Sequence, residues 1–384
     1  MRVLFSSTTG VGHVFPMLPL ARAFVAAGHD VLWAAGEQVH RVLETTGIPA
    51  VRCGPTASED ARLRESVRGP AMAMPGPERA AYVFPRMFGA ALAPPMAADL
   101  LPIARAWEPD LLVHENGELA SPLVGAVLGA PSLTHAFGGP VPAQNLSDAG
   151  ERLSSMWSEQ GLEVPPYAGC FEATYLDICP ASVRSEPRDH VVDVQPLRPV
   201  ADIGGPTDPA PLPEEQGPPL VYVTMGTVQN RALDLGPLVS ALAALPVRVL
   251  VAVGQDADPA ALGAQPANVV VERWVDQPRV LQRSAVVVSH GGSGTFLGAL
   301  AAGLPQLCLP QGADQFRNAD GGLRSGAALR LLPPEISPST VAEAVDRLLT
   351  DHGLRDAAAG VAAEIAAMPS PDEVAALLVE RFGG

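Results

Sequence analysis

The chain has 384 residues, of which 47% are hydrophobic and 17% charged, and its formal net charge is −16. This length is enough for two domains with large cores. The acidic balance disfavours nucleic acids and anionic membranes as partners, because both require a basic surface. Lysine is absent from the sequence, which excludes a P-loop lysine and Schiff-base catalysis.

The apolar stretches of the sequence are broken by Gly, Pro, His or Arg before they reach membrane-spanning length. The N-terminus also lacks a basic leader followed by a cleavage site, so we expect a cytoplasmic protein with no membrane partner. The cysteines are far apart and form no CxxC pair, which supports neither a zinc site nor a disulfide framework. They are Cys53, Cys170, Cys179 and Cys308.

The N-terminal residues predict a strand, a turn and a helix. Residues 2–7 are apolar, and the turn at residues 8–13 contains Gly12 and His13. The turn is not a GxGxxG fingerprint, and no acid after the second predicted strand, residues 29–35, clearly serves a ribose. A dinucleotide dehydrogenase is therefore not expected. A histidine at a helix start is usually a surface or capping residue, although an imidazole at a sheet edge also suits general-base catalysis.

The middle of the first half offers an acid and a candidate apolar pocket. Residues 111–114 predict a strand that delivers Glu115 at its C-terminal end, with His114 beside it. Residues 72–107 predict helices broken at Pro75, Pro85 and residues 94–95, with an apolar loop. That segment lines a ligand pocket or forms ordinary core.

The second half repeats the pattern of the first. Residues 197–219 are dense in Pro, Gly, Asp and Glu with little periodicity, and they contain the predicted linker. Residues 220–225 then predict a strand, followed by a turn at Gly226 and Thr227. The acids at residues 256 and 258 resemble a DxD metal motif, but Asp258 precedes a proline and a helix, so we interpret it as an N-cap and assign no metal.

Residues 284–318 carry the most informative pattern. An apolar strand leads to the small residues at positions 290–295, whose backbone N–H groups gather at a helix N-terminus, a favourable place for phosphate. A second strand leads to Asp314 and Gln315 at the sheet edge where ligands bind. Tight turns alone would explain the glycines, but not His290 or the Asp314-Gln315 pair. The combination suits a nucleotide sugar.

Trp274, Val275 and Gln277 end a preceding strand. An indole in that position can flank a nucleotide base, and main-chain groups can contact the edge of the base. A tryptophan that simply fills the core is the alternative interpretation.

These residues together resemble the donor-binding signature of family 1 glycosyltransferases, and in particular the actinomycete enzymes that decorate natural products, of the calicheamicin and macrolide type. The resemblance implies an α/β protein of the GT-B fold, with two facing Rossmann-like domains built on parallel sheets. The implied divisions are residues 1–200 for the acceptor, 201–218 for the linker, 219–366 for the nucleotide sugar, and 367–384 for a helix that returns to the N-terminal domain.

The resemblance also implies the roles of individual residues. His13 is expected to be the catalytic base and Glu115 its partner, although the family usually has Asp there. The expected donor-binding residues are Gly12, Thr227, Trp274, Val275, Gln277, His290, Gly291, Gly292, Ser293, Gly294, Thr295, Asp314 and Gln315. No metal and no cofactor are expected.

The implied reaction is inverting transfer of a sugar or deoxysugar from a dTDP- or UDP-sugar to a hydroxyl of a small hydrophobic aglycone, such as a polyketide antibiotic. A homodimer is compatible with the sequence. Two alternatives remain open at this point. One is an enzyme like the UDP-sugar 2-epimerases, which share the fold but need no acceptor pocket. The other is a non-catalytic auxiliary protein that binds nucleotide sugar.

Overall fold

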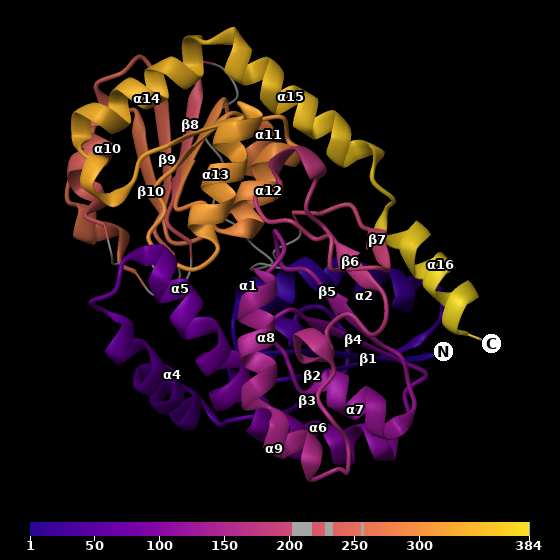
Figure 1. The fold of residues 1–384 in the computed structure, drawn as a ribbon. Coiled ribbons are helices and arrows are strands. Elements are labelled where there is room, and N and C mark those ends of the chain that lie inside the picture. The colour runs from indigo at the N-terminus through magenta and orange to yellow at the C-terminus, as the bar shows by residue number, and fades with distance from the viewer. Residues whose placement is uncertain (202–216, 227–232, 255–256, 384) are drawn as a thin grey trace. The chain divides into compact units, whose positions relative to one another are not determined.

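The computed structural model describes residues 1–201, 217–226, 233–254 and 257–383, apart from the side chain of Pro77. The chain divides into two compact units (Figure 1). Unit 1 contains residues 1–179, residues 186–198 and the C-terminal segment from Met368, and unit 2 contains residues 180–185 and 199–367. Most of the predicted linker at 201–218 lies outside the described residues.

Unit 1 is built on a seven-stranded sheet, as far as the described residues show, in the order β3-β2-β1-β4-β5-β6-β7. All neighbouring strands are parallel. The strands are β1 (Arg2–Ser7), β2 (Asp30–Ala35), β3 (Ala50–Arg52), β4 (Leu111–Glu115), β5 (Ser132–His135), β6 (Tyr175–Asp177) and β7 (Val194–Pro196). Because β1 lies between β2 and β4, the turns after β1 and β4 meet at one edge of the sheet.

Unit 1 also contains α-helices, most of which connect these strands. They are α1 (Val11–Val14), α2 (Leu18–Ala26), α3 (Glu37–Glu44), α4 (Ala57–Ala71), α5 (Gly76–Phe84), α6 (Ala93–Trp107), α7 (Ser121–Leu128), α8 (Ala143–Arg152), α9 (Ser154–Ser158) and α16 (Pro371–Phe382). The last of them, α16, contacts α2. An ion pair of 2.7 Å between Arg381 and Asp193 also holds α16 to unit 1.

The segment between α5 and α6 differs from the prediction. The chain stays helical from Gly76 to Trp107, because a π-helical stretch, η2 (Pro85–Leu92), joins the two helices. Prolines stand in the first positions of η2 and α6, where a missing N–H is tolerated. The predicted breaks at Pro85 and at residues 94–95, and the apolar loop, were therefore wrong.

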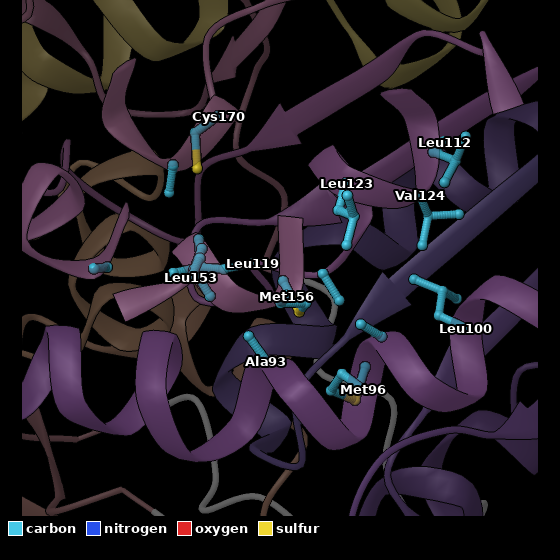
Figure 2. Close-up of a cluster of buried hydrophobic side chains, with 14 of the residues drawn as sticks. Ala93, Met96, Leu100, Leu112, Leu119, Leu123, Val124, Leu153, Met156 and Cys170 are labelled. Carbon is cyan, nitrogen blue, oxygen red and sulfur yellow. The ribbon is translucent and has the colours of Figure 1, made fainter. Parts of the chain in front are cut away.

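Residues 78–107 within this stretch are long and apolar enough to span a membrane by length and composition alone, contrary to the sequence expectation. Their apolar side chains pack in the core of unit 1, however. Figure 2 shows Met96 and Leu100 of α6 in a cluster with Leu112 of β4 and Leu123 of α7. The helix is therefore a core element of its unit.

Unit 2 is built on a six-stranded parallel sheet within the described residues, in the order β10-β9-β8-β11-β12-β13. The strands are β8 (Leu220–Thr224), β9 (Arg248–Ala252), β10 (Val269–Glu272), β11 (Val286–Ser289), β12 (Gln306–Cys308) and β13 (Ala328–Arg330). The α-helices are α10 (Leu235–Ala243), α11 (Gln277–Arg283), α12 (Ser293–Ala301), α13 (Gln315–Ser325), α14 (Pro338–Thr350) and α15 (His352–Ala367). Two Rossmann-like units with parallel sheets confirm the predicted fold class.

Residues 180–185 belong to unit 2, although unit 1 holds the chain on both sides of them. The carboxylate of Glu364 on α15 accepts hydrogen bonds from the backbone N–H groups of Ala181 and Ser182. The guanidinium of Arg324 on α13 donates to the carbonyl of Arg184 at 2.8 Å. At the base of the excursion, Arg188 forms an ion pair of 2.6 Å with Asp177. The sequence did not predict this excursion.

Gly321→Ala tests how tightly α13 packs on this excursion. A Cβ at Gly321 would lie 1.9 Å from the backbone carbonyl oxygen of Val183, so the two segments must separate. We expect a loss of roughly 1–3 kcal/mol in the free energy of unfolding. Gly360→Ala on α15 is the matched control, since a Cβ there meets nothing within 4 Å. That variant should gain about 0.5–1 kcal/mol. Urea unfolding measures both, and equal stabilities would contradict the expectation.

Candidate functional site

The turn after β1 carries His13 into a partly open environment. The His13 side chain is 22% exposed and lies between two aromatic rings, with centroid distances of 4.8 Å to Phe137 and 5.6 Å to Phe88. Gly10 permits this position, because a Cβ there would lie 2.8 Å from Cδ2 of His13. Gly12, by contrast, faces open space. The imidazole is thus fixed by its neighbours while part of its edge stays accessible.

Glu115, at the end of β4, is fully buried and faces the same turn. Its Oε2 atom lies 3.0 Å from Nδ1 of His13 and accepts from the backbone N–H of Gly117. Its Oε1 atom accepts from the backbone N–H of Thr8 at 3.2 Å and from the hydroxyl of Thr8 at 3.0 Å. The contact between Oε2 and Nδ1 is close but not aligned as a hydrogen bond.

The pKa of Glu115 reflects these contacts. Burial alone would raise it, but the adjacent His13 imidazole and the donors from Gly117 and Thr8 hold the pKa of Glu115 below its ordinary value. A buried carboxylate that stays ionised orients an imidazole and stabilises its protonated form. The arrangement can therefore accept a proton at the outer nitrogen of His13.

The neighbouring His114 does not compete for this role. Successive side chains of a strand point to opposite faces, and His114 contacts the carbonyl of Glu118 at 2.8 Å and the hydroxyl of Thr134 at 3.0 Å. Burial lowers the pKa of His114. The structure thus brings Glu115 to His13 and directs His114 elsewhere.

His135 is a second buried histidine close to Glu115. It pairs in register with Glu115 across β4 and β5, is fully buried, and lies 2.5 Å through Nδ1 from the carbonyl of Ala136. Burial lowers the pKa of His135 from 6.5 to about 4, although the Ala136 carbonyl and Glu115 oppose the shift. No sequence pattern marked His135 as a site residue, whereas Phe88 lies within residues 72–107, the segment expected to line a ligand pocket or form ordinary core.

In unit 2, the turn between β11 and α12 carries the residues that the sequence predicts to bind phosphate. Gly291 has a φ of 80°, a conformation that favours glycine, and its N–H donates to the hydroxyl of Ser289 at 3.0 Å. Gly292 is the N-cap of α12 and has no side chain to cap the helix. The first N–H groups of the helix, from Ser293 to Thr295, are therefore available to an anion.

His290 lies in a pocket between two glycines. A Cβ at Gly226 would lie 2.5 Å from Cε1 of His290, and a Cβ at Gly292 would lie 2.4 Å from its Nε2. Burial lowers the pKa of His290, while the Asp314 carboxylate and the backbone carbonyl of Thr224 oppose the shift. Its Nδ1 is buried without an aligned partner. The ring is thus held beside the first turn of α12.

Asp314 is part of a network that joins α12 to α13. Its Oδ2 atom accepts from the hydroxyl of Ser293 at 2.6 Å and from the amide of Asn318 at 3.0 Å. Asn318 also donates to the carbonyl of Gly291 at 2.9 Å. This network places a carboxylate beside the glycine-rich turn.

The other predicted donor-binding residues that the structure describes are buried or half-buried. The side-chain oxygen of Gln315 accepts from the backbone N–H groups of Gln311 and Gly312, at 2.8 and 3.0 Å. The side-chain oxygen of Gln277 accepts from the hydroxyl of Thr295 at 3.3 Å. Both glutamine side chains are buried, Val275 lies in the core and Trp274 is half-buried. Thr227 lies outside the described residues.

No group of three or more His, Cys, Asp or Glu side chains in the described part of the chain is arranged to hold a metal ion. Asp258 accepts a hydrogen bond of 3.1 Å from the backbone N–H of Ala260, which confirms its interpretation as an N-cap. Its predicted companion, Asp256, falls among the residues that the structure does not describe.

The chain is similar to known proteins along its whole length. Residues 237–381 match the family model described as the C-terminal domain of erythromycin biosynthesis protein CIII-like proteins. The chain is 33% identical to the elloramycin glycosyltransferase ElmGT of Streptomyces olivaceus, over all of this chain and 98% of the relative.

Solved structures agree with this relationship. The glycosyltransferase SnogD from Streptomyces nogalater has a TM-score of 0.78 at 31% identity, covering 100% of this chain and 99% of its own. The glycosyltransferase VinC, solved in complex with dTDP, has a TM-score of 0.82 at 25% identity, with full coverage of both chains. These relatives are glycosyltransferases, so neither an epimerase nor a non-catalytic auxiliary protein is favoured.

His135→Asn tests the electrostatics behind the site. Because the pKa of His135 falls from 6.5 to about 4 on folding, the unfolded chain binds a proton between these pH values that the folded chain refuses. His135 should thus reduce the free energy of unfolding by about 3 kcal/mol as pH falls from 7 to 4. The asparagine keeps a donor for Ala136 but does not titrate.

Urea unfolding at intervals of pH measures the difference between the wild type and this variant. The exposed His352→Asn is the control, because it makes the same change of residue on the surface of α15. Parallel pH profiles for the wild type and His135→Asn would show that His135 makes no such contribution.

Proposed function

We propose that this chain, a member of the family of actinomycete natural-product glycosyltransferases of the GT-B fold, is an inverting deoxysugar transferase. The proposed donor is a dTDP- or UDP-sugar, and the proposed acceptor is a hydroxyl of a small hydrophobic aglycone. The observation that carries this proposal is the buried Glu115 carboxylate 3.0 Å from Nδ1 of His13. The names of the relatives, an elloramycin glycosyltransferase and erythromycin biosynthesis proteins, support an antibiotic-like natural product as the acceptor. The reaction is proposed to take place in the cytoplasm.

In the proposed mechanism, unit 1 activates the acceptor. Glu115 holds Nδ1 of His13, so the other ring nitrogen, Nε2, takes the proton of the acceptor hydroxyl. The acceptor oxygen forms a bond to the anomeric carbon while the bond from that carbon to the diphosphate oxygen breaks. Attack from the face opposite the diphosphate inverts the configuration. Glu115 stabilises the imidazolium that forms.

Unit 2 is proposed to hold the donor. The diphosphate gains negative charge as it leaves, and the N–H groups of residues 293–295 at the start of α12 stabilise that charge. His290 donates to a phosphate oxygen, Trp274 flanks the base, and Asp314 with Gln315 holds the sugar hydroxyls. The dTDP bound in the structure of VinC supports a thymidine donor for this chain.

The function is tested by following donor consumption with a panel of dTDP- and UDP-sugars, with and without candidate aglycones, by liquid chromatography and mass spectrometry. We expect a new glycoside only when an acceptor is present, together with one nucleoside diphosphate per transfer. Isomerisation of the donor without an acceptor would indicate an epimerase. Nucleotide-sugar binding with no product from any acceptor would indicate an auxiliary protein.

His13→Ala should reduce turnover by roughly 10²–10⁴-fold, because the acceptor hydroxyl loses its base. Binding of dTDP, measured by calorimetry, should stay close to the wild-type value, because the phosphate site is built from unit 2. Wild-type turnover with an alkyl hydroxyl acceptor would show that His13 is not the base. A loss of dTDP affinity would instead assign His13 to donor binding.

Gly292→Ala should weaken dTDP and UDP binding by about 10-fold or more, the equivalent of one lost hydrogen bond to a charged group. The added Cβ would lie 2.4 Å from Nε2 of His290 and must displace the ring. Gly360→Ala, a glycine of the same unit in open space, is the control for affinity and fold. Unchanged affinity in a folded Gly292→Ala variant would remove His290 and this turn from the phosphate site.

Transfer should persist at the wild-type rate after dialysis against EDTA. The proposed phosphate contacts are a helix N-terminus, a histidine and backbone N–H groups, which together supply the positive potential that other transferases take from a divalent cation. Added Mg²⁺ or Mn²⁺ should change kcat by less than about twofold. An EDTA-sensitive rate that Mg²⁺ restores would contradict metal independence.

A further inference from the structure

We propose that Thr9, Asp60 and Arg64 are positioning residues that fix the turn bearing His13 in its catalytic place. The inference rests on the proposed role of His13 as the base and extends it to helix α4, which lies some fifty residues further along the chain. None of these residues touches Glu115 or His13 through a hydrogen bond that the structure shows. Their effect passes through the backbone of the turn.

The hydroxyl of Thr9 lies inside an ion pair of α4. It donates to Oδ1 of Asp60 at 3.1 Å and accepts from Nη2 of Arg64 at 2.5 Å. The other carboxylate oxygen of Asp60 is 2.7 Å from Nε of Arg64. Asp60 is only 6% exposed, so its charge is stabilised mainly by these two partners. Thr9, Asp60 and Arg64 therefore form a hydrogen-bonded junction between α4 and the turn.

The methyl group of Thr9 is held as well. A Cβ at Gly36, before α3, would lie 2.1 Å from Cγ2 of Thr9, so this glycine leaves room for the methyl group. The preceding residue, Thr8, binds Glu115 through both its N–H and its hydroxyl. Two successive threonines thus fasten the turn on two sides, one to the catalytic carboxylate and one to α4.

The turn transmits any movement of Thr9 to His13. Gly10 follows Thr9 directly and accepts a hydrogen bond of 2.9 Å at its carbonyl from the N–H of His13. Gly10 also lies against the imidazole, since a Cβ there would be 2.8 Å from Cδ2. On the other side of the junction, α4 is anchored at its start by a capping box between Thr56 and Glu59.

The single hydroxyl of Thr9 donates to the carboxylate and accepts from the guanidinium at the same time. Thr9→Val keeps the shape of the side chain and loses both hydrogen bonds. Thr9→Ser keeps the hydroxyl and loses only the methyl group. This pair separates the junction from simple packing, and Arg62→Met on the exposed face of α4 controls for a change of charge on the same helix.

The test combines steady-state kinetics with hydrogen exchange of the full chain, followed by mass spectrometry of peptides that cover residues 8–14. In Thr9→Val we expect kcat to fall roughly 10- to 100-fold, as for a misplaced catalytic group, with KM for the donor within about twofold and dTDP binding unchanged. Exchange of the turn peptide should accelerate. Thr9→Ser and Arg62→Met should match the wild type in both measurements.

Wild-type kcat and exchange in Thr9→Val would overturn the proposal, as would an equal loss of kcat in Thr9→Ser. A Thr9→Val variant too unstable to assay would be replaced by Arg64→Met, for which the same results are expected. His13→Ala serves as the reference. If it retains full turnover, the proposed base is wrong, while the exchange of the turn peptide in Thr9→Val still decides whether the junction holds the turn.

Discussion

The structure of the candidate site depends on the burial of one carboxylate. An ionised carboxylate without water is strongly destabilising unless its oxygens find donors, and Glu115 obtains them from Thr8 and Gly117, with the His13 ring in close contact. These donors belong to the turn after β1 and the turn after β4. The strand order places β1 beside β4, so both turns reach the same edge of the sheet. Topology thus supplies the partners that keep the charge stable, and the charge in turn orients the histidine.

In unit 2, the position of the His290 ring depends on the space that two glycines leave for it. The turn after β8 and the turn after β11 are neighbours in the sheet, and each offers a glycine to the ring of His290. Side chains at Gly226 or Gly292 would occupy the volume of the imidazole. The network of Ser293, Asp314 and Asn318 then fixes α12 relative to α13. Each unit therefore presents a histidine at the switch point of its sheet, where the strand order reverses.

The sequence predicted the parts of the site that follow from local pattern. Apolar runs ending in small or polar residues marked the strand ends and so placed His13, Glu115 and the turn at residues 290–295 at sheet edges, while the roles expected of His13 and Glu115 came from the family resemblance. It could not predict contacts between distant segments. Asp60 and Arg64 lie in a polar helix whose pattern shows nothing of Thr9, and nothing local marks residues 180–185 as part of unit 2. The prolines at positions 85, 94 and 95 misled the prediction because they stand in the first positions of a π-helical stretch and of α6, and the chain stays helical through them.

The path of the chain between the two units limits how relatives could exchange parts. A single crossover between residues 198 and 199 would leave residues 180–185 from one parent to dock on Gly321, Arg324 and Glu364 from the other. The same crossover would separate Asp193 from its partner Arg381 on α16. A hybrid of two relatives would therefore need residues 180–185 to come from the second parent and α16 from the first. Because of the excursion, the two units do not correspond to two continuous halves of the sequence.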